Sequence, residues 1–101
     1  MAQIIWTDPA LSELDEIANY IALDKPNAAR KLVTQVFERI EQLSDFPDSG
    51  KKPIEIKDSP YLEIVINPCR IFYRHEKDCV YVLFVLRSER DLRKYLIDNQ
   101  H

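Results

Sequence analysis

Apolar and polar positions along the first half of the chain predict a short strand followed by two helices. The run Gln3–Trp6 is short and apolar, which is typical of an opening strand. Apolar residues then recur at steps of three and four, the spacing of one helical face. We expect this first helix to begin with Asp8 as N-cap and Pro9 in its first turn, and to end near Asp24. Its apolar face comprises Ala10, Leu11, Leu14, Ile17, Ala18 and Ile21, and the acidic residues expected to face away from it are Glu13, Asp15 and Glu16.

A second helix is expected from Pro26 to Phe46, and Pro47 should end it. The link Lys25–Asn27 is too short for anything except a tight connection, so the two helices should lie antiparallel. The unbroken apolar stripe of the second helix comprises Ala28, Ala29, Leu32, Val33, Val36, Phe37, Ile40, Leu43 and Phe46.

The second half of the chain has the alternation of strands. A proline-rich loop over 47–60 holds the only glycine, and period-two runs follow at 61–66, 70–75 and 79–86. Residues 76–78 supply a turn between the last two runs, and Leu92, Tyr95 and Leu96 have the spacing of a short helix. We therefore expect an α+β domain over 1–101, with an N-terminal strand, an antiparallel helical hairpin, a three- to four-stranded antiparallel sheet and a short C-terminal helix.

Length and composition limit the class of protein. A chain of 101 residues should form one domain, because two smaller pieces would each bury too little core. No run reaches the ~18 apolar residues of a membrane span, and the N-terminus lacks a secretion signal, so we expect a cytoplasmic protein with no membrane partner. The net charge of −3 hides an asymmetry, since acids are in excess over residues 1–50 and bases over residues 51–101.

Several kinds of active site have no counterpart in the sequence. A single glycine excludes a Gly-rich phosphate loop, and neither a Gly-x-Ser-x-Gly elbow nor a His-Glu-x-x-His helix occurs. Cys69 and Cys79 fall inside apolar runs and, like His75 and His101, lack the spacing of metal ligands. We expect free buried thiols, no metal site and no cofactor.

A set of cations in the second half remains as candidate chemistry. Arg70 and Arg74 share one strand face, Lys51 and Lys52 lie in the loop, and Arg87, Arg90, Arg93 and Lys94 follow the last strand. Because arginine presents a planar fork that suits phosphate or carboxylate, this surface could grip an RNA backbone or an acidic protein patch. Two plainer interpretations stay open. The bases after the last strand could form ion pairs with the acids of the same exposed segment, each worth roughly 0–1 kcal/mol. Arg70 and Arg74 could instead be the polar face of an edge hairpin.

Taken in order, these segments resemble the RelE/ParE superfamily of small toxins from bacterial type II toxin–antitoxin systems. The resemblance covers nearly the whole chain, and its ordered set of pieces is more specific than any one of them. The pieces are Ile5–Thr7, Pro9-Ala10, Leu14, Ile17–Ile21, Pro26–Ala29, Leu43, Phe46-Pro47, Gly50, Glu63–Val65, Cys69–Arg74 and Val80–Leu86. Trp6, Tyr20-Ile21 and Asn27–Ala29 are most similar to the ParE-like branch.

The ParE-like resemblance implies a non-enzymatic toxin that inhibits DNA gyrase by direct binding and is neutralised by a cognate ParD-like antitoxin. The residues expected to bind the target are Arg87, Arg90, Arg93, Tyr95 and Leu96. We expect the antitoxin to lay an amphipathic segment across the helix–sheet surface, as a helix in a groove or as an added strand, with acidic residues meeting the arginines.

The RelE-like branch supplies the alternative, a ribosome-dependent mRNA endoribonuclease. Its catalytic set would be Lys51, Lys52, Arg70, Arg90 and Tyr95. Ser88 stands where that branch has an arginine, which weakens the stabilisation of phosphate during cleavage. The ParE-like pattern is also incomplete, because Leu62 and Arg87 stand where many members have arginine and histidine. A third hypothesis is a domain that has lost its toxicity and only binds the antitoxin.

Overall fold

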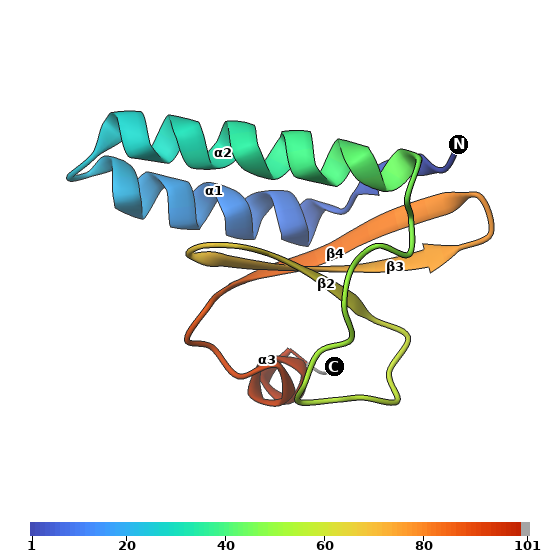
Figure 1. Ribbon diagram of the computed structural model, residues 1–101. Helices are drawn as coiled ribbons and strands as arrows, with labels where there is room; N and C mark the ends of the chain where they lie inside the picture. Colours follow the sequence, from blue (N-terminus) through green and yellow to red (C-terminus); the bar gives the residue numbers. More distant parts are fainter. Residues whose placement is uncertain (100–101) are drawn as a thin grey trace.

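The computed structural model describes residues 1–99, and Gln100 and His101 lie outside the described residues. The elements follow the expected order of strand, two helices, three strands and helix, so the α+β class is confirmed (Figure 1). Their bounds are β1 (Gln3–Trp6), α1 (Asp8–Ala22), α2 (Pro26–Glu41), the short 3-10 helix η1 (Gln42–Ser44), β2 (Leu62–Ile66), β3 (Cys69–Glu76), β4 (Cys79–Arg87) and α3 (Leu92–Asp98).

Two helix ends differ from the sequence prediction. The N-cap of α1 is Thr7 and not Asp8, because the Thr7 hydroxyl accepts from the backbone N–H of Ala10 and donates to the Val82 carbonyl at 2.7 Å. The second difference is the C-terminal end of α2. The α-helix stops before the expected Phe46, and the chain continues only as the 3-10 helix η1. The N-terminal segment fixes this exit, since the backbone N–H of Ala2 donates to the Ser44 carbonyl at 2.8 Å.

The sheet has the strand order β1-β4-β3-β2. β2 pairs with β3, and β3 with β4, in antiparallel fashion, and Lys77 takes a positive φ of 56° in the turn between β3 and β4. β1 instead runs parallel to β4, from Gln3 beside Cys79 to Trp6 beside Val82. The expected antiparallel sheet is therefore present in β2, β3 and β4, and the N-terminal strand adds one parallel pairing that the sequence did not predict. The chain between β1 and β4 is a long crossover that contains both long helices, which permits the parallel direction.

The sheet is covered on both faces (Figure 1). The hairpin of α1 and α2 packs on one face, where the largest cluster of buried residues includes Leu14, Ile40 and Ile71. α3 and the loop before β2 lie on the other face, over Phe72 and Phe84. β3, which carries Arg70 and Arg74, lies between β2 and β4 and is covered on both faces, so these two arginines are not on an edge strand as one interpretation allowed.

Candidate functional site

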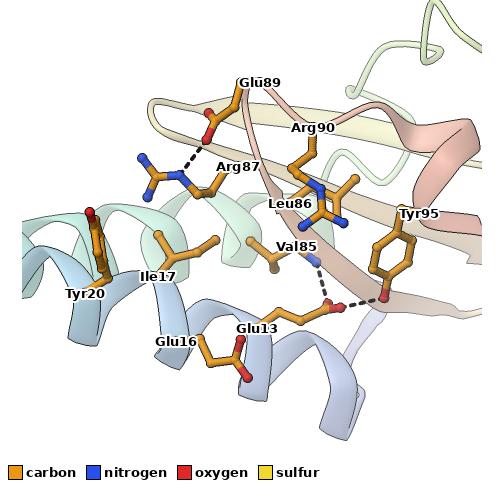
Figure 2. Close-up of a pocket in the computed structure, with 10 residues that line it drawn as sticks. All are labelled: Glu13, Glu16, Ile17, Tyr20, Val85, Leu86, Arg87, Glu89, Arg90 and Tyr95. Atoms are coloured by element: carbon orange, nitrogen blue, oxygen red, sulfur yellow. Dashed lines mark hydrogen bonds and ion pairs between the residues drawn. The ribbon is translucent and has the colours of Figure 1, made fainter. Parts of the chain in front are cut away.

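A groove of about 490 Å³ opens where α1, the end of β4 and α3 meet (Figure 2). Glu13 and Ile17 of α1 line it on one side, and Val85 and Arg87 of β4 line it on another. Tyr95 of α3 completes it at one end. The groove therefore joins the residues predicted from the end of the last strand to a part of α1 that the sequence did not single out.

The edge of β4 that faces the groove has no neighbouring strand among the described residues. β1 pairs only with Cys79–Val82, and the Thr7 hydroxyl then binds the carbonyls of Val82 and Leu83. Further along, the Glu13 carboxylate accepts from the backbone N–H of Val85 at 2.9 Å. The Glu13 side chain of α1 thus accepts the hydrogen bond that the Val85 N–H would otherwise donate to a neighbouring strand.

The same Glu13 carboxylate accepts from the Tyr95 hydroxyl at 2.5 Å (Figure 2). The Tyr95 ring stacks on Phe84, with ring centroids 4.9 Å apart. Burial first, and then the neighbouring Glu13 carboxylate, raise the pKa of Tyr95 well above its usual range, so the hydroxyl stays protonated and acts as a donor. We call this pair the Glu13–Tyr95 clasp, because it joins α1 to α3 across the open edge of β4.

Arg87 lies beside the groove in a half-exposed position. Its Nε donates to the Glu89 carboxylate at 2.7 Å, and its guanidinium lies over the Tyr20 ring at 5.8 Å from the centroid. The hydrogen bond from Arg87 lowers the pKa of Glu89. The self-paired arrangement that the sequence left open therefore exists for Arg87, although an exposed pair of this kind is easily exchanged for a partner's carboxylate.

Arg90 also lines the groove, but no carboxylate pairs with its side chain within residues 1–99. Arg93 is 64% exposed and lies 3.9 Å from Asp91, too far for a strong interaction. Leu96 is half-buried and packs against the core beneath α3. The structure thus places Arg87, Arg90 and Tyr95 around one groove, whereas Arg93 and Leu96 lie on α3 outside its lining.

Arg70 is a buried cation that two carboxylates neutralise. It donates to Glu63 at 2.6 Å, to both Glu55 oxygens at 2.7 Å, and to the Arg90 carbonyl at 2.8 Å. The bond from Arg70 lowers the pKa of Glu55 to about 2, and the bond from Glu55 is the largest cause of the raised pKa of Arg70. Glu55 also accepts from the backbone N–H of Leu92 at 3.1 Å. The cluster joins β2, β3, the loop and the start of α3.

The residues of the alternative nuclease set do not meet at one place. Lys51, Arg70 and Arg90 line a second depression of about 440 Å³, together with the two carboxylates that bind Arg70. The Lys52 ammonium instead donates to the Ser59 carbonyl at 3.3 Å, and the Tyr95 hydroxyl faces Glu13 in the groove. A phosphate in this depression would have to compete with internal carboxylates for Arg70.

The sequence interpretation missed three carboxylates that organise these sites. Glu13 was expected to face away from the core, yet it follows the apolar face of α1 at a four-residue step before Ile17, a signal that could have indicated an inward position. Glu63 lies inside an apolar strand run, which was a second usable signal. Glu55 stands in an irregular loop and carried no periodic signal.

Metal and thiol chemistry have little support in the described part of the chain. No cluster of His, Cys, Asp and Glu among residues 1–99 has the geometry of a metal site. Cys69 is buried and Cys79 half-buried, and both thiols are free. Burial raises the pKa of Cys69 to about 11, so this thiol is protonated and unreactive at neutral pH. None of the helices described is long and apolar enough to cross a bilayer.

Comparisons with known proteins identify relatives over most of the chain. Residues 4–92 match the family model described as ParE toxin of the type II toxin–antitoxin system, parDE. Putative toxin Y4kP of Sinorhizobium fredii is 36% identical over 88 residues, which are 87% of this chain and 90% of that protein. Toxin RelE2 of Caulobacter vibrioides is 33% identical over 51 residues, which are 50% of this chain and 58% of that protein.

A solved structure has the same fold. It is described as the chromosomal ParDE TA system from P. aeruginosa, and the matching chain superposes with a TM-score of 0.74 at 21% identity. The match covers 88% of this chain and 98% of that chain.

Proposed function

The chain belongs to the ParE toxin family of type II toxin–antitoxin systems, and from that membership we propose that it inhibits DNA gyrase by direct contact and is held silent by a cognate ParD-like antitoxin. The target surface in this proposal comprises Arg87, Arg90, Arg93, Tyr95 and Leu96. Gyrase is the target that the family resemblance implies, and contact through an arginine-bearing surface is the mechanism that suits these residues.

One observation supports a binding toxin over a nuclease. Arg70 belongs to the alternative nuclease set, but its guanidinium donates four hydrogen bonds to groups of the protein itself. Arg90, in contrast, has no carboxylate partner within the described chain and lies at the rim of an open groove. Because Arg90 belongs to both residue sets and lines both hollows, the neutralised Arg70 is the observation that weighs against phosphate cleavage.

The proposal is tested with purified toxin in a gyrase supercoiling assay. We expect inhibition by the wild-type chain and its loss in the double variant Arg87→Ala with Arg90→Ala, because the gripping charges are removed while no buried contact of either side chain is lost. The matched control is Arg30→Ala with Lys31→Ala, which removes two exposed charges from α2. Undiminished inhibition by the first variant would refute the site.

The endoribonuclease remains the second candidate, because Lys51, Arg70 and Arg90 line one depression. Wild-type toxin that cuts ribosome-bound message and leaves supercoiling unchanged would replace the gyrase proposal with this one. A domain without toxicity is separated from both by expression in the absence of antitoxin, since unchanged growth would leave antitoxin binding as its activity.

A further inference from the structure

The turn that carries Arg90 is held from inside the protein. The backbone N–H of Arg90 donates to the Arg87 carbonyl at 3.0 Å, and the Arg90 carbonyl accepts from the Arg70 guanidinium at 2.8 Å. Two residues later, the N–H of Leu92 donates to the Glu55 carboxylate at 3.1 Å. The exposed Arg90 side chain lines the groove (Figure 2), and it therefore projects from a stretch of backbone that both members of one ion pair bind.

Glu55 uses its two carboxylate oxygens for different contacts. One oxygen accepts from Arg70, whereas the other accepts from both Arg70 and the Leu92 N–H. Leu92 is fully buried and is the first residue of α3, so its N–H finds no acceptor within the helix. Because a buried N–H without a partner is costly, the Glu55 carboxylate stabilises the start of α3 in its observed position.

The loop that carries Glu55 is itself anchored on both sides of this residue. Before it, Lys51 and Glu63 exchange backbone hydrogen bonds at 3.0 and 2.7 Å, which tie the loop to β2. Pro53 is fully buried, and Ile56 packs against the buried cluster beneath α3. The Glu55 carboxylate thus has the rigid support that a group needs in order to orient another group.

We propose that Glu55 is a positioning residue for the target surface, which acts with Arg70 to fix the backbone of residues 90–92 and thereby the Arg90 side chain and the start of α3. This inference rests on the proposed function and deepens it, since it adds a residue that supports the target surface from behind. A side chain whose backbone is already held loses less conformational freedom when it binds a partner. The ion pair therefore contributes to recognition through geometry, although its own charges are neutralised.

Glu63 provides a matched comparison, because it binds the same guanidinium from the other side. It accepts from Arg70 at 2.6 Å, and none of its hydrogen bonds within residues 1–99 reaches the start of α3. Removal of either carboxylate leaves Arg70 with one acidic partner. The Glu63 side chain is 4% exposed against 13% for Glu55, so a purely structural role of the cluster predicts that the loss of Glu63 is at least as harmful. Positioning through Leu92 predicts the opposite order for the target surface.

Amide exchange at Leu92 tests the positioning directly. We expect Glu55→Ala to speed exchange of the Leu92 N–H by about tenfold, and Glu63→Ala to change it by less than about twofold. Glu55→Gln retains an oxygen that can accept from Leu92, so its exchange should stay within about twofold of the wild type. Equal acceleration in the two alanine variants would overturn the proposal. Fast exchange at Leu92 in a folded Glu55→Gln variant would also overturn it, even if Glu55→Ala did not fold.

A supercoiling assay tests the consequence for the target surface. The toxin concentration for half-inhibition of gyrase should rise about fivefold in Glu55→Ala, rise less than about twofold in Glu63→Ala, and return towards the wild-type value in Glu55→Gln. Equal rises in the two alanine variants, measured under conditions where circular dichroism shows both to be folded, would overturn the proposal. A wild-type chain without any effect on supercoiling would refute the proposed function instead, and exchange at Leu92 would still decide whether Glu55 fixes this backbone.

Discussion

At the scale of single residues, the least expected result is the burial of Arg70. It is 8% exposed, and its two carboxylate partners are buried or nearly so. A charge in such a place stabilises the fold only while its partners remain, because each ion has lost its hydration. The sequence showed an arginine on a strand, and it could not show that acids from two other segments would enclose it.

Replacement of Arg70 should therefore destabilise the protein strongly. We expect Arg70→Ala to lower the free energy of unfolding by about 3–5 kcal/mol, since Glu55 and Glu63 are left buried without a counter-charge. Arg74→Ala is the control on the same strand, because Arg74 is 45% exposed in its pair with Glu76 and should cost at most about 1 kcal/mol. Urea unfolding of both variants measures the difference, and equal losses would contradict the role given to Arg70.

The same cluster predicts how stability depends on acid. Glu55 has a folded-state pKa of about 2 against an ordinary value of 4.5. Between these values the unfolded chain binds a proton that the folded chain does not, so the contribution of Glu55 is present above about pH 4.5 and is lost as the pH falls towards 2. Urea midpoints measured from about pH 5 to about pH 2 should fall less steeply for Glu55→Gln than for the wild type.

At the scale of elements, α3 is a short helix held at its first turn. The Asp91 carboxylate accepts from the backbone N–H of Arg93 at 2.8 Å and of Lys94 at 3.3 Å, and Glu55 binds the N–H of Leu92. The position of the helix that carries much of the proposed target surface therefore depends on two side chains at its start.

Loss of the cap should loosen α3 and leave the rest of the fold in place. We expect Asp91→Ala to cost about 1 kcal/mol locally, seen as faster amide exchange in α3 with no change in α1 and α2. Asp98→Ala is the control at the other end of the helix, where the carboxylate caps no N–H group and opposes the helix dipole. Equal exchange in the two variants would show that the cap does not hold the helix.

Periodicity explains why the elements were predictable. β1 has the predicted bounds, α2 begins at the predicted Pro26, and the last two strands extend only slightly beyond their predicted runs. These features depend on residues close in the sequence. The N-cap at Thr7 was missed because its hydroxyl also serves the distant Val82 carbonyl, and the Glu13–Tyr95 clasp because its members are 82 residues apart.

At the scale of the whole molecule, the sheet separates two cores of unequal size. The larger core lies beneath the helical hairpin and the smaller one beneath α3. The larger core should govern global stability, because most of the fully buried aliphatic residues belong to it.

A cavity in the larger core should thus lower the stability of the entire fold. Ile40 is fully buried, and we expect Ile40→Ala to reduce the free energy of unfolding by about 2–5 kcal/mol. Leu23→Ala is the control, because Leu23 is 85% exposed at the end of the hairpin and should change stability by no more than about 0.5 kcal/mol. Chemical denaturation monitored by circular dichroism provides both values.

The parallel pairing of β1 with β4 has a consequence for the order of events during synthesis. β1 leaves the ribosome before β4, and its partner residues in β4 are 76 positions later. Contacts between such distant positions form late, after the intervening chain has been organised. A nascent chain therefore cannot complete its sheet, nor the groove beside it, until β4 has emerged from the exit tunnel. Any partner that recognises the groove would therefore meet a finished surface only after β4 has been translated.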